Sequence, residues 1–197
     1  MAVDFKQSET MKNLMKAFAG ESQARNRYTI GAAQAKQENL YVINFLFTYT
    51  ADQEKEHAEI FYNHLKEMAG ENIEIDGTYP VDIDPKIEQL LKMAQHNEYE
   101  EHDDVYKHFG DKAKEEGFDK IANSFHMIAA IEKIHGDRFG KFAELIENNE
   151  LFVSNVETKW MCLNCGHVVD AKSAPKQCPV CSHNQGYFIR MELSPFH

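Results

Sequence analysis

Apolar residues recur every three or four positions in four segments of the first 148 residues, which is the period of a helix with one buried face. This spacing predicts helices over about 8–36, 41–69, 85–116 and 119–148. A proline stands in the first turn of the third helix, and Gly117 separates the third helix from the fourth. We therefore expect an all-α four-helix bundle.

The connection between the second and third helices is long. Residues 70–85 contain two glycines, two prolines and several aspartates. Such a connection can run back along the bundle instead of turning a corner, so we expect one long crossover. After Asn149 the helical period fades, and the remaining chain has the short runs and turn residues of a small β-rich module. The sequence thus predicts three parts, namely a bundle over 1–148, a linker over 149–158 and a second domain over 159–197.

Carboxylates and imidazoles interrupt the apolar faces of two predicted helices. The second helix carries Glu54 and His57, and the fourth carries Glu132 and His135, in the same Glu-x-x-His spacing. A spacing of three puts the two side chains next to each other on one helix face, so one turn offers two ligands to a metal. A single pair of this kind is usually solvated surface, but two such pairs on apolar faces favour a metal site.

The first and third helices also bring acid to the predicted core, with Glu21, Glu98 and Glu101 on their apolar faces. Ionised carboxylates buried without partners are very costly, so cations must neutralise them. One Glu from each of two helices, with Glu-x-x-His from each of the other two, is the ligand set of di-iron and di-manganese bundles. Hard oxygen ligands with two imidazoles suit iron or manganese better than soft metals.

Two tyrosines and several other histidines are further candidates for the same site. Tyr28 lies two turns beyond Glu21 on the same face, where packing is the more common role. On an ideal helix Tyr106 lies about 80° from Glu98 and about 140° from Glu101, so periodicity does not bring it into the site. The remaining histidines of the bundle are interpreted as solvated surface, namely His64, His96, His102, His108 and His126.

All four cysteines lie in the C-terminal domain, as two Cys-x-x-Cys turns separated by twelve residues: Cys162, Cys165, Cys178 and Cys181. Four thiolates form a tetrahedral cage that suits zinc or a single iron, and the spacing does not choose between the two metals. A redox-active di-iron site needs electrons one at a time. Iron in a thiolate cage can pass them and zinc cannot, so the neighbouring bundle favours iron.

Charge and hydropathy narrow the class of protein. The chain has 32 Asp and Glu against 21 Lys and Arg, and its net charge of −11 disfavours nucleic acid and anionic lipid as partners. We find no apolar run suited to a signal peptide or to a membrane span of roughly 20 residues. We therefore expect a cytoplasmic protein, in which the cysteines are metal ligands before they are disulfides.

These motifs together resemble the rubrerythrin family over nearly the whole chain. The matching runs are AFAGESQARNRY around Glu21, ADQEKEH ending at His57, the stretch from Glu98 to Tyr106, EKIHGDRF from Glu132, and the four-cysteine tail. Ferritins lack the cysteine tail and zinc ribbons lack the bundle. The resemblance implies a ferritin-like di-iron bundle followed by a rubredoxin-like iron domain.

The resemblance also assigns roles to the bundle residues. It implies that Glu54 and Glu132 bridge two irons, that Glu21 and Glu98 are terminal ligands, and that His135 holds one iron.

The other iron of the pair would be shared by two side chains, with His57 bound in the reduced state and Glu101 in the oxidised state. Tyr28 and Tyr106 match family tyrosines that hydrogen-bond near the iron ligands.

The implied activity is reduction of hydrogen peroxide to water at the non-haem di-iron site, as a defence against oxidative stress. Electrons would come from an NAD(P)H-linked reductase or a rubredoxin and pass through the four-cysteine iron. At least a homodimer is implied. The physiological donor stays open, as does the choice between peroxide and dioxygen as the main oxidant. Two alternatives remain: a ferroxidase that handles iron, and a metal-sensing or nucleic-acid-binding protein with a zinc-ribbon tail.

Overall fold

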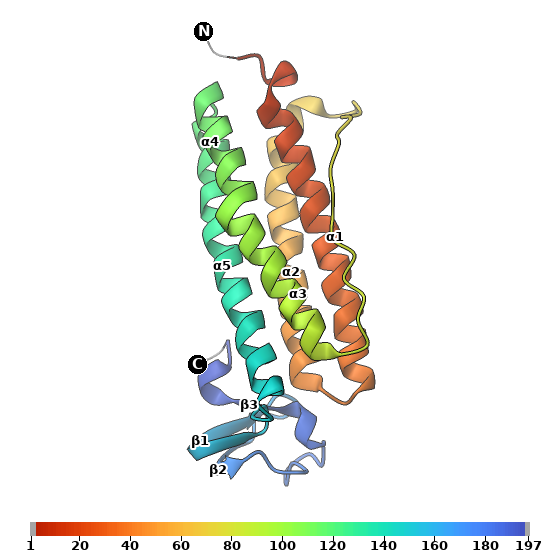
Figure 1. Cartoon of the computed structure of the whole chain (residues 1–197), viewed down its shortest axis with the longest axis vertical. Coiled ribbons are helices and arrows are strands. Elements are labelled where there is room, and N and C mark those ends of the chain that lie inside the picture. Colours follow the sequence, from red (N-terminus) through yellow and green to blue (C-terminus); the bar gives the residue numbers. More distant parts are fainter. Residues whose placement is uncertain (1–2, 196–197) are drawn as a thin grey trace.

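The computed structural model describes residues 3–195. Its larger part is a bundle of four helical rods, one of them built from α3 and α4, and the expected four-helix bundle is confirmed (Figure 1). The first helical hairpin packs α1 against α2, and the second packs α3 and α4 against α5. The helices are α1 (Glu9–Gln37), α2 (Tyr41–His64), α3 (Ile87–Glu100), α4 (Tyr106–Glu116) and α5 (Asp119–Glu147).

Side chains satisfy the exposed backbone groups where α1 begins. The Ser8 hydroxyl accepts a hydrogen bond from the Met11 amide, as expected of an N-cap residue. Glu116, at the end of α4, accepts hydrogen bonds from the amides of Glu9 and Thr10. A carboxylate at a helix N-terminus is stabilising because the free amides there are partly positive. The start of α1 and the end of α4 are therefore joined.

The third rod differs from the single α-helix expected over 85–116. A π-helical turn, Glu101–Val105 (η3), joins α3 to α4. A π-turn takes one more residue than an α-turn, so it rotates every side chain that follows relative to those before it. Gly117 ends α4 with a φ of 91°, a conformation that glycine adopts without strain.

The long crossover is also present. The second helix ends at His64, earlier than expected, and is followed by the short 3₁₀ turn η2 (Lys66–Met68). Residues 70–86 then form neither helix nor strand and run along α1 to the start of α3 (Figure 1). Asp82 anchors this segment, because its carboxylate accepts hydrogen bonds from the Arg27 guanidinium and from the side-chain amide of Asn97.

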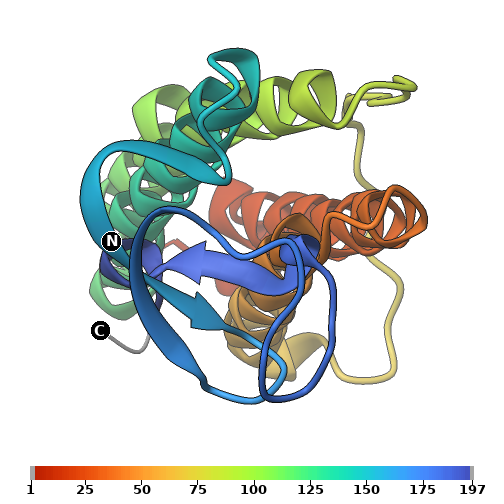
Figure 2. The same cartoon turned by 90° about the horizontal axis from the view of Figure 1, so that it is seen from below.

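The C-terminal domain is a three-stranded antiparallel sheet in the order β2-β1-β3. Its strands are β1 (Val153–Cys162), β2 (Val168–Ser173) and β3 (Phe188–Arg190). β1 begins inside the segment 149–158 that the sequence suggested as a linker. The domain lies at one end of the bundle (Figure 1 and Figure 2). There the rings of Tyr41 and Tyr187 stack with centroids 3.9 Å apart.

Two apolar clusters fill the bundle. The cluster nearer the C-terminal domain includes Ile43, Phe47 and Phe139, and the other includes Leu14, Phe61 and Phe125. Glu21 and Glu54 lie between these groups along α1 and α2, so apolar side chains close the bundle above and below a polar layer. Within residues 3–195 no helix is long and apolar enough to cross a membrane.

Candidate metal centres

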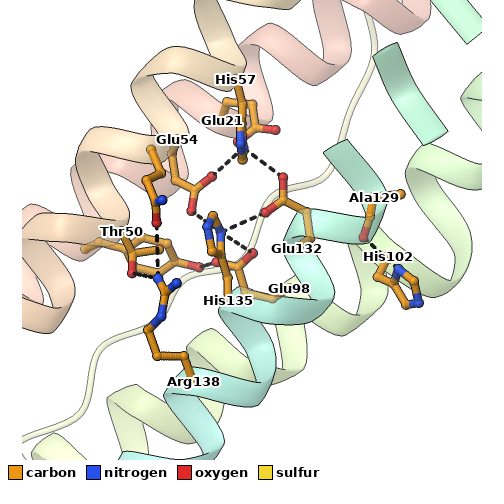
Figure 3. A network of polar contacts seen from close by, with 12 residues as sticks. Glu21, Thr50, Glu54, His57, Glu98, His102, Ala129, Glu132, His135 and Arg138 are labelled. Atoms are coloured by element: carbon orange, nitrogen blue, oxygen red, sulfur yellow. Dashed lines mark hydrogen bonds and ion pairs between the residues drawn. The ribbon is translucent and has the colours of Figure 1, made fainter. Parts of the chain in front are cut away.

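Six of the predicted ligands meet in the middle of the bundle. Each has at most 5 % of its surface exposed, and each helical rod contributes at least one. Figure 3 shows their side chains directed toward one another: Glu21 from α1, Glu54 and His57 from α2, Glu98 from α3, and Glu132 and His135 from α5.

The six residues form two overlapping groups of donor atoms. One group is Glu21, Glu54, His57 and Glu132, and the other is Glu54, Glu98, Glu132 and His135. Within each group the donor atoms all lie within 4.8 Å of one another. Because both groups contain Glu54 and Glu132, these two carboxylates lie between two neighbouring positions, as bridging ligands would.

The distances to the two imidazoles repeat in the two groups. His57 Nδ1 lies 3.1 Å from Glu54 Oε2 and 2.9 Å from Glu132 Oε1. His135 Nδ1 lies 3.0 Å from Glu54 Oε1 and 2.9 Å from Glu132 Oε2. Each imidazole therefore lies beside one oxygen of each shared carboxylate, which is the arrangement expected if each shared carboxylate uses one oxygen for each metal.

Hydrogen bonding does not satisfy this layer. Both oxygens of Glu132, one oxygen each of Glu21, Glu54 and Glu98, and both ring nitrogens of His135 are buried without a hydrogen-bond partner. Several of these atoms are close together, but their angles do not suit hydrogen bonds. Buried polar atoms without partners are costly. Oxygen and imidazole donors converging on two points fit two ions of iron or manganese.

The pKa values of the metal-free protein also favour positive ions in this layer. Burial and the neighbouring carboxylates raise the pKa values of Glu21, Glu98 and Glu101 well above their usual range. Burial opposes a charge on the imidazoles too, but pairing with Glu132 and Glu54 raises the pKa of His57 to about 9 and that of His135 to about 12. Protons on the two imidazoles thus supply positive charge where metal ions would supply it.

Glu101 lies outside both groups of donor atoms. His57 is in contact with the shared carboxylates, whereas Glu101 lines a cavity beside the polar layer. The sequence resemblance has these two residues exchange at one iron. The structure therefore brings together six of the seven predicted bundle ligands and leaves the seventh at the edge.

Both predicted tyrosines reach the site. The Tyr28 hydroxyl donates a hydrogen bond to Glu98, and the Tyr106 hydroxyl donates one to Glu21 Oε1 at 2.6 Å. The α-helical period placed Tyr106 on the wrong side, and η3 explains why. One extra residue in the turn reduces the angle between Glu101 and Tyr106 from about 140° to about 40°.

Periodicity also missed Arg138, one turn after His135 on α5. Its guanidinium donates to Gln53 Oε1 at 3.1 Å and lies over the ring of Tyr49. Figure 3 shows the Arg138 side chain beside Thr50. Burial lowers its pKa, and the charges of Glu54 and Glu98 act in the opposite direction. A half-buried cation near the carboxylates reduces their mutual repulsion. The run EKIHGDRF contains this arginine, so its spacing from His135 was a usable signal.

Of the histidines interpreted as surface, His96, His108 and His126 are exposed. His102 and His64 are only partly exposed. A ring nitrogen of His102 lies 2.6 Å from the Ala129 carbonyl, and one of His64 lies 2.9 Å from the Ser124 hydroxyl. Neither is in a group of candidate metal ligands within residues 3–195.

The four cysteines form a second cluster, with all four sulfurs within 4.8 Å of one another. They are free thiols, and the pairs Cys162–Cys181 and Cys165–Cys178 are each 3.7 Å apart, too far for a disulfide. The two turns match: the amide after each second cysteine donates to the carbonyl of the first, from Gly166 and from Ser182. This sulfur cage fits one metal ion.

The backbone after each Cys-x-x-Cys turn is left-handed, with φ of 76° at Gly166 and 60° at Ser182. Glycine adopts this conformation freely, whereas serine does so at a cost. The second turn therefore keeps the geometry of the first despite its different residue, which the sequence did not indicate.

Comparisons with known proteins agree with this arrangement. The chain matches the family model for rubrerythrin over residues 12–143 and the model for the rubredoxin-like domain of rubrerythrin over residues 160–189. It is 43 % identical to the rubrerythrin of Clostridium perfringens, over 93 % of this chain and 94 % of that protein.

Solved structures show the same fold. A mixed-valence structure of nigerythrin superposes with a TM-score of 0.62 at 25 % identity, covering 93 % of this chain and 90 % of that one. A bacterioferritin from Desulfovibrio desulfuricans, solved for its diiron site, gives a TM-score of 0.64 at 22 % identity, over 72 % of this chain and 82 % of that one. The latter likeness concerns the ferritin-like fold alone. With both family models matched in order and the candidate ligands of both metal sites gathered in the fold, the chain belongs to the rubrerythrin family, whose members bind iron.

Proposed function

We propose that this chain is a non-haem di-iron peroxidase that reduces hydrogen peroxide to water in the cytoplasm, as a defence against oxidative stress. Its electrons come from an NAD(P)H-linked reductase or a rubredoxin and pass through iron held by the four cysteines. One observation carries the proposal. A buried layer with two groups of metal donors and a separate thiolate cage occur in the same chain.

In this proposal Glu54 and Glu132 would each hold both irons, and the other four residues of the layer would divide between the two irons. Glu21 and His57 hold one iron, and Glu98 and His135 hold the other, as the two groups of donor atoms suggest. Two ferrous ions bound there supply the two electrons that peroxide needs for cleavage of its O–O bond.

Glu101 is the proposed alternative ligand to His57. It lies beside the layer rather than in it, so binding requires its side chain to move from the cavity wall.

The two tyrosines orient the terminal carboxylates. Burial raises the pKa of Tyr28 and that of Tyr106 well above 10, so both phenols keep their protons at neutral pH. A protonated phenol can only donate to the carboxylate beside it, which fixes the rotamers of Glu98 and Glu21. The phenol hydroxyl of Tyr28 is also a proton source next to the reacting centre. The apolar clusters on either side exclude bulk water.

The placement of the C-terminal domain supports relay between two chains. Tyr187, beside the cysteines, stacks on Tyr41 at the start of α2. From Tyr41 to Glu54 the helix axis extends about 20 Å. Electron tunnelling falls steeply with distance, so a path of this length within one chain is slow. We therefore propose a homodimer in which the thiolate-bound iron of one chain serves the di-iron site of the other.

A Cys162→Ser variant tests the relay directly. We expect NAD(P)H-driven peroxide turnover to be lost, while the reduced di-iron site is still oxidised stoichiometrically by peroxide. Ser173→Ala, at an exposed position on β2, is the control and should retain full turnover. Unchanged turnover in Cys162→Ser would rule out the relay.

Iron content separates this proposal from iron storage. The peroxidase retains three irons per chain. A ferroxidase that stores iron retains far more, and that result would replace the proposed function.

A further inference from the structure

A cavity of about 520 Å³ lies beside the polar layer. Its walls come from α1, from the crossover segment around Tyr79 and from the stretch where α3, η3 and α4 join, and Figure 1 shows the crossover running along α1. Glu101 and Tyr106 form part of its lining, and the Tyr106 hydroxyl donates to Glu21. The cavity therefore adjoins one of the two groups of donor atoms.

The volume is far larger than hydrogen peroxide needs. A water molecule occupies about 30 Å³ of liquid, and hydrogen peroxide is little larger. Cavities of roughly 300–1,000 Å³ with apolar walls and a few polar groups are where small organic molecules bind. The apolar part of this lining is substantial: Ala17, Tyr79, Pro80, Val105 and Phe109.

The charges around the cavity favour a neutral guest. Lys16 pairs with Asp76 at 3.1 Å, and Arg27 pairs with Asp82. Both cations in the lining thus already have a carboxylate partner. Glu100, an exposed residue of the lining, adds negative charge, which repels an anionic molecule.

We propose that this cavity admits a neutral organic hydroperoxide, R–O–O–H, as a second substrate class. The inference rests on the proposed peroxidase function. The O–O bond breaks, two electrons come from the ferrous pair, and two protons from solvent complete the products. One molecule of the alcohol R–OH and one of water are formed. The organic group R occupies the cavity while the peroxide end lies beside Glu101.

Gly20 offers a way to fill the cavity. A Cβ placed there would lie 3.8 Å from Tyr79 Cε1 and 3.9 Å from the Tyr106 hydroxyl oxygen, which is ordinary contact. A methyl group therefore fits without displacement, and a larger side chain extends into the space. Thr78, an exposed residue of the crossover, fills the cavity from another wall when replaced by tryptophan.

The experiment uses iron-loaded protein with two readouts. Binding of the unreactive alcohol 2-phenyl-2-propanol to the oxidised protein is measured by titration calorimetry. Single-turnover oxidation of the reduced protein is measured with hydrogen peroxide and with cumene hydroperoxide. We expect the natural protein to bind the alcohol and to react with both peroxides.

Gly20→Leu and Thr78→Trp should weaken alcohol binding at least tenfold and slow cumene hydroperoxide at least tenfold, with the hydrogen peroxide rate unchanged within threefold. Gly20→Ala is the matched control and should behave as the natural protein. If Gly20→Leu fails to fold or to take up iron, Thr78→Trp decides.

Absence of alcohol binding, or equal slowing of both peroxides in the filled variants, overturns the inference. So does a natural protein that reacts with hydrogen peroxide but not with cumene hydroperoxide, and in that case the proposed function stands. If neither peroxide reacts, the proposed function itself fails.

Discussion

Buried carboxylates dominate the energetics of the bundle at the scale of single residues. Glu21, Glu54, Glu98 and Glu132 each have at most 1 % of their surface exposed, and several of their oxygens have no hydrogen-bond partner. Such a layer destabilises the metal-free fold, because charge that is removed from water must be neutralised nearby. Metal binding and folding are therefore coupled in this protein.

Replacing one carboxylate separates the destabilisation of the metal-free fold from the stabilisation that metal binding provides. Glu21→Gln keeps an acceptor for the Tyr106 hydroxyl but removes a carboxyl whose pKa is raised well above its usual range by burial. At about pH 8 we expect the metal-free variant to be more stable than the natural protein, by about 1–2 kcal/mol, and to gain less stability from metal. Chemical denaturation with and without iron measures the stability of the metal-free protein and the stability gained from metal. Glu56→Gln, at an exposed position of α2, should change neither; a less stable metal-free Glu21→Gln would contradict the account.

The two imidazoles make metal binding depend on pH. Burial opposes their protonation, yet pairing with carboxylates raises the pKa of His57 from 6.5 to about 9 and that of His135 to about 12. Because the folded chain holds these protons more tightly, they stabilise the metal-free fold fully below about pH 6.5, and the contribution of His57 is lost as pH rises through about 9.

A bound metal displaces both protons. Between about pH 6 and pH 8 the affinity for Mn²⁺ should therefore rise at least about tenfold per pH unit. Titration calorimetry in buffers of different ionisation enthalpy counts the protons released. An affinity that is the same at both pH values would show that the imidazoles are not protonated in the metal-free site.

At the scale of elements, the period of the apolar residues predicted the helices but not the π-turn that interrupts the third one. The faces that carry Glu54 and Glu132 were predictable because each interrupts a regular apolar stripe. The π-turn Glu101–Val105 was not, because its first four residues are polar and none of the five signals an extra position in the turn. The position of Tyr106 depends on that turn, so only the family resemblance indicated its role.

The crossover was predictable in length but not in its attachment. Asp82 was one of several acids in a loop, and the fold pairs it with Arg27 and Asn97. The side chains of Asp82 and Arg27 are only 15 % and 13 % exposed, so the pair is largely desolvated. Contacts of this kind join residues far apart in sequence, and no local pattern reveals them.

Asp82→Ala should release the crossover from α1. We expect a loss of about 1–3 kcal/mol of stability, because the largely buried guanidinium of Arg27 is left without its partner. Hydrogen exchange in residues 70–86 should become faster. Asp76→Ala removes an exposed partner of Lys16 and should leave stability unchanged. Equal exchange rates in the natural protein and Asp82→Ala would show that another contact holds the crossover.

At the scale of the whole molecule, the C-terminal domain is fitted closely onto the end of the bundle. Tyr187 stacks on Tyr41, and Gly186 lies against the loop between α1 and α2. A Cβ at Gly186 would lie 1.8 Å from the Asn39 carbonyl oxygen, which is closer than any real contact. The cysteine spacing predicted the metal cage, but nothing in the sequence indicated where the cage would dock.

Gly186→Ala should therefore separate the domain from the bundle without dismantling either. We expect proteolysis in the segment around residue 150 to accelerate at least tenfold, while the visible spectrum of the four-cysteine iron stays unchanged. Ser173→Ala is the control at an exposed position of the same domain. If the variant resists protease as well as the control does, the close contact at Asn39 does not hold the domains together.

The buried acidic layer needs two metal ions to neutralise its carboxylates. The most direct measurement is a crystal structure of anaerobically purified protein with anomalous data collected at the iron edge. We expect three iron peaks per chain: two in the bundle, with the Glu54 and Glu132 carboxylates between them, and one inside the cage of the four cysteine sulfurs. An iron-free bundle with Glu54 and Glu132 turned outward to solvent would contradict it.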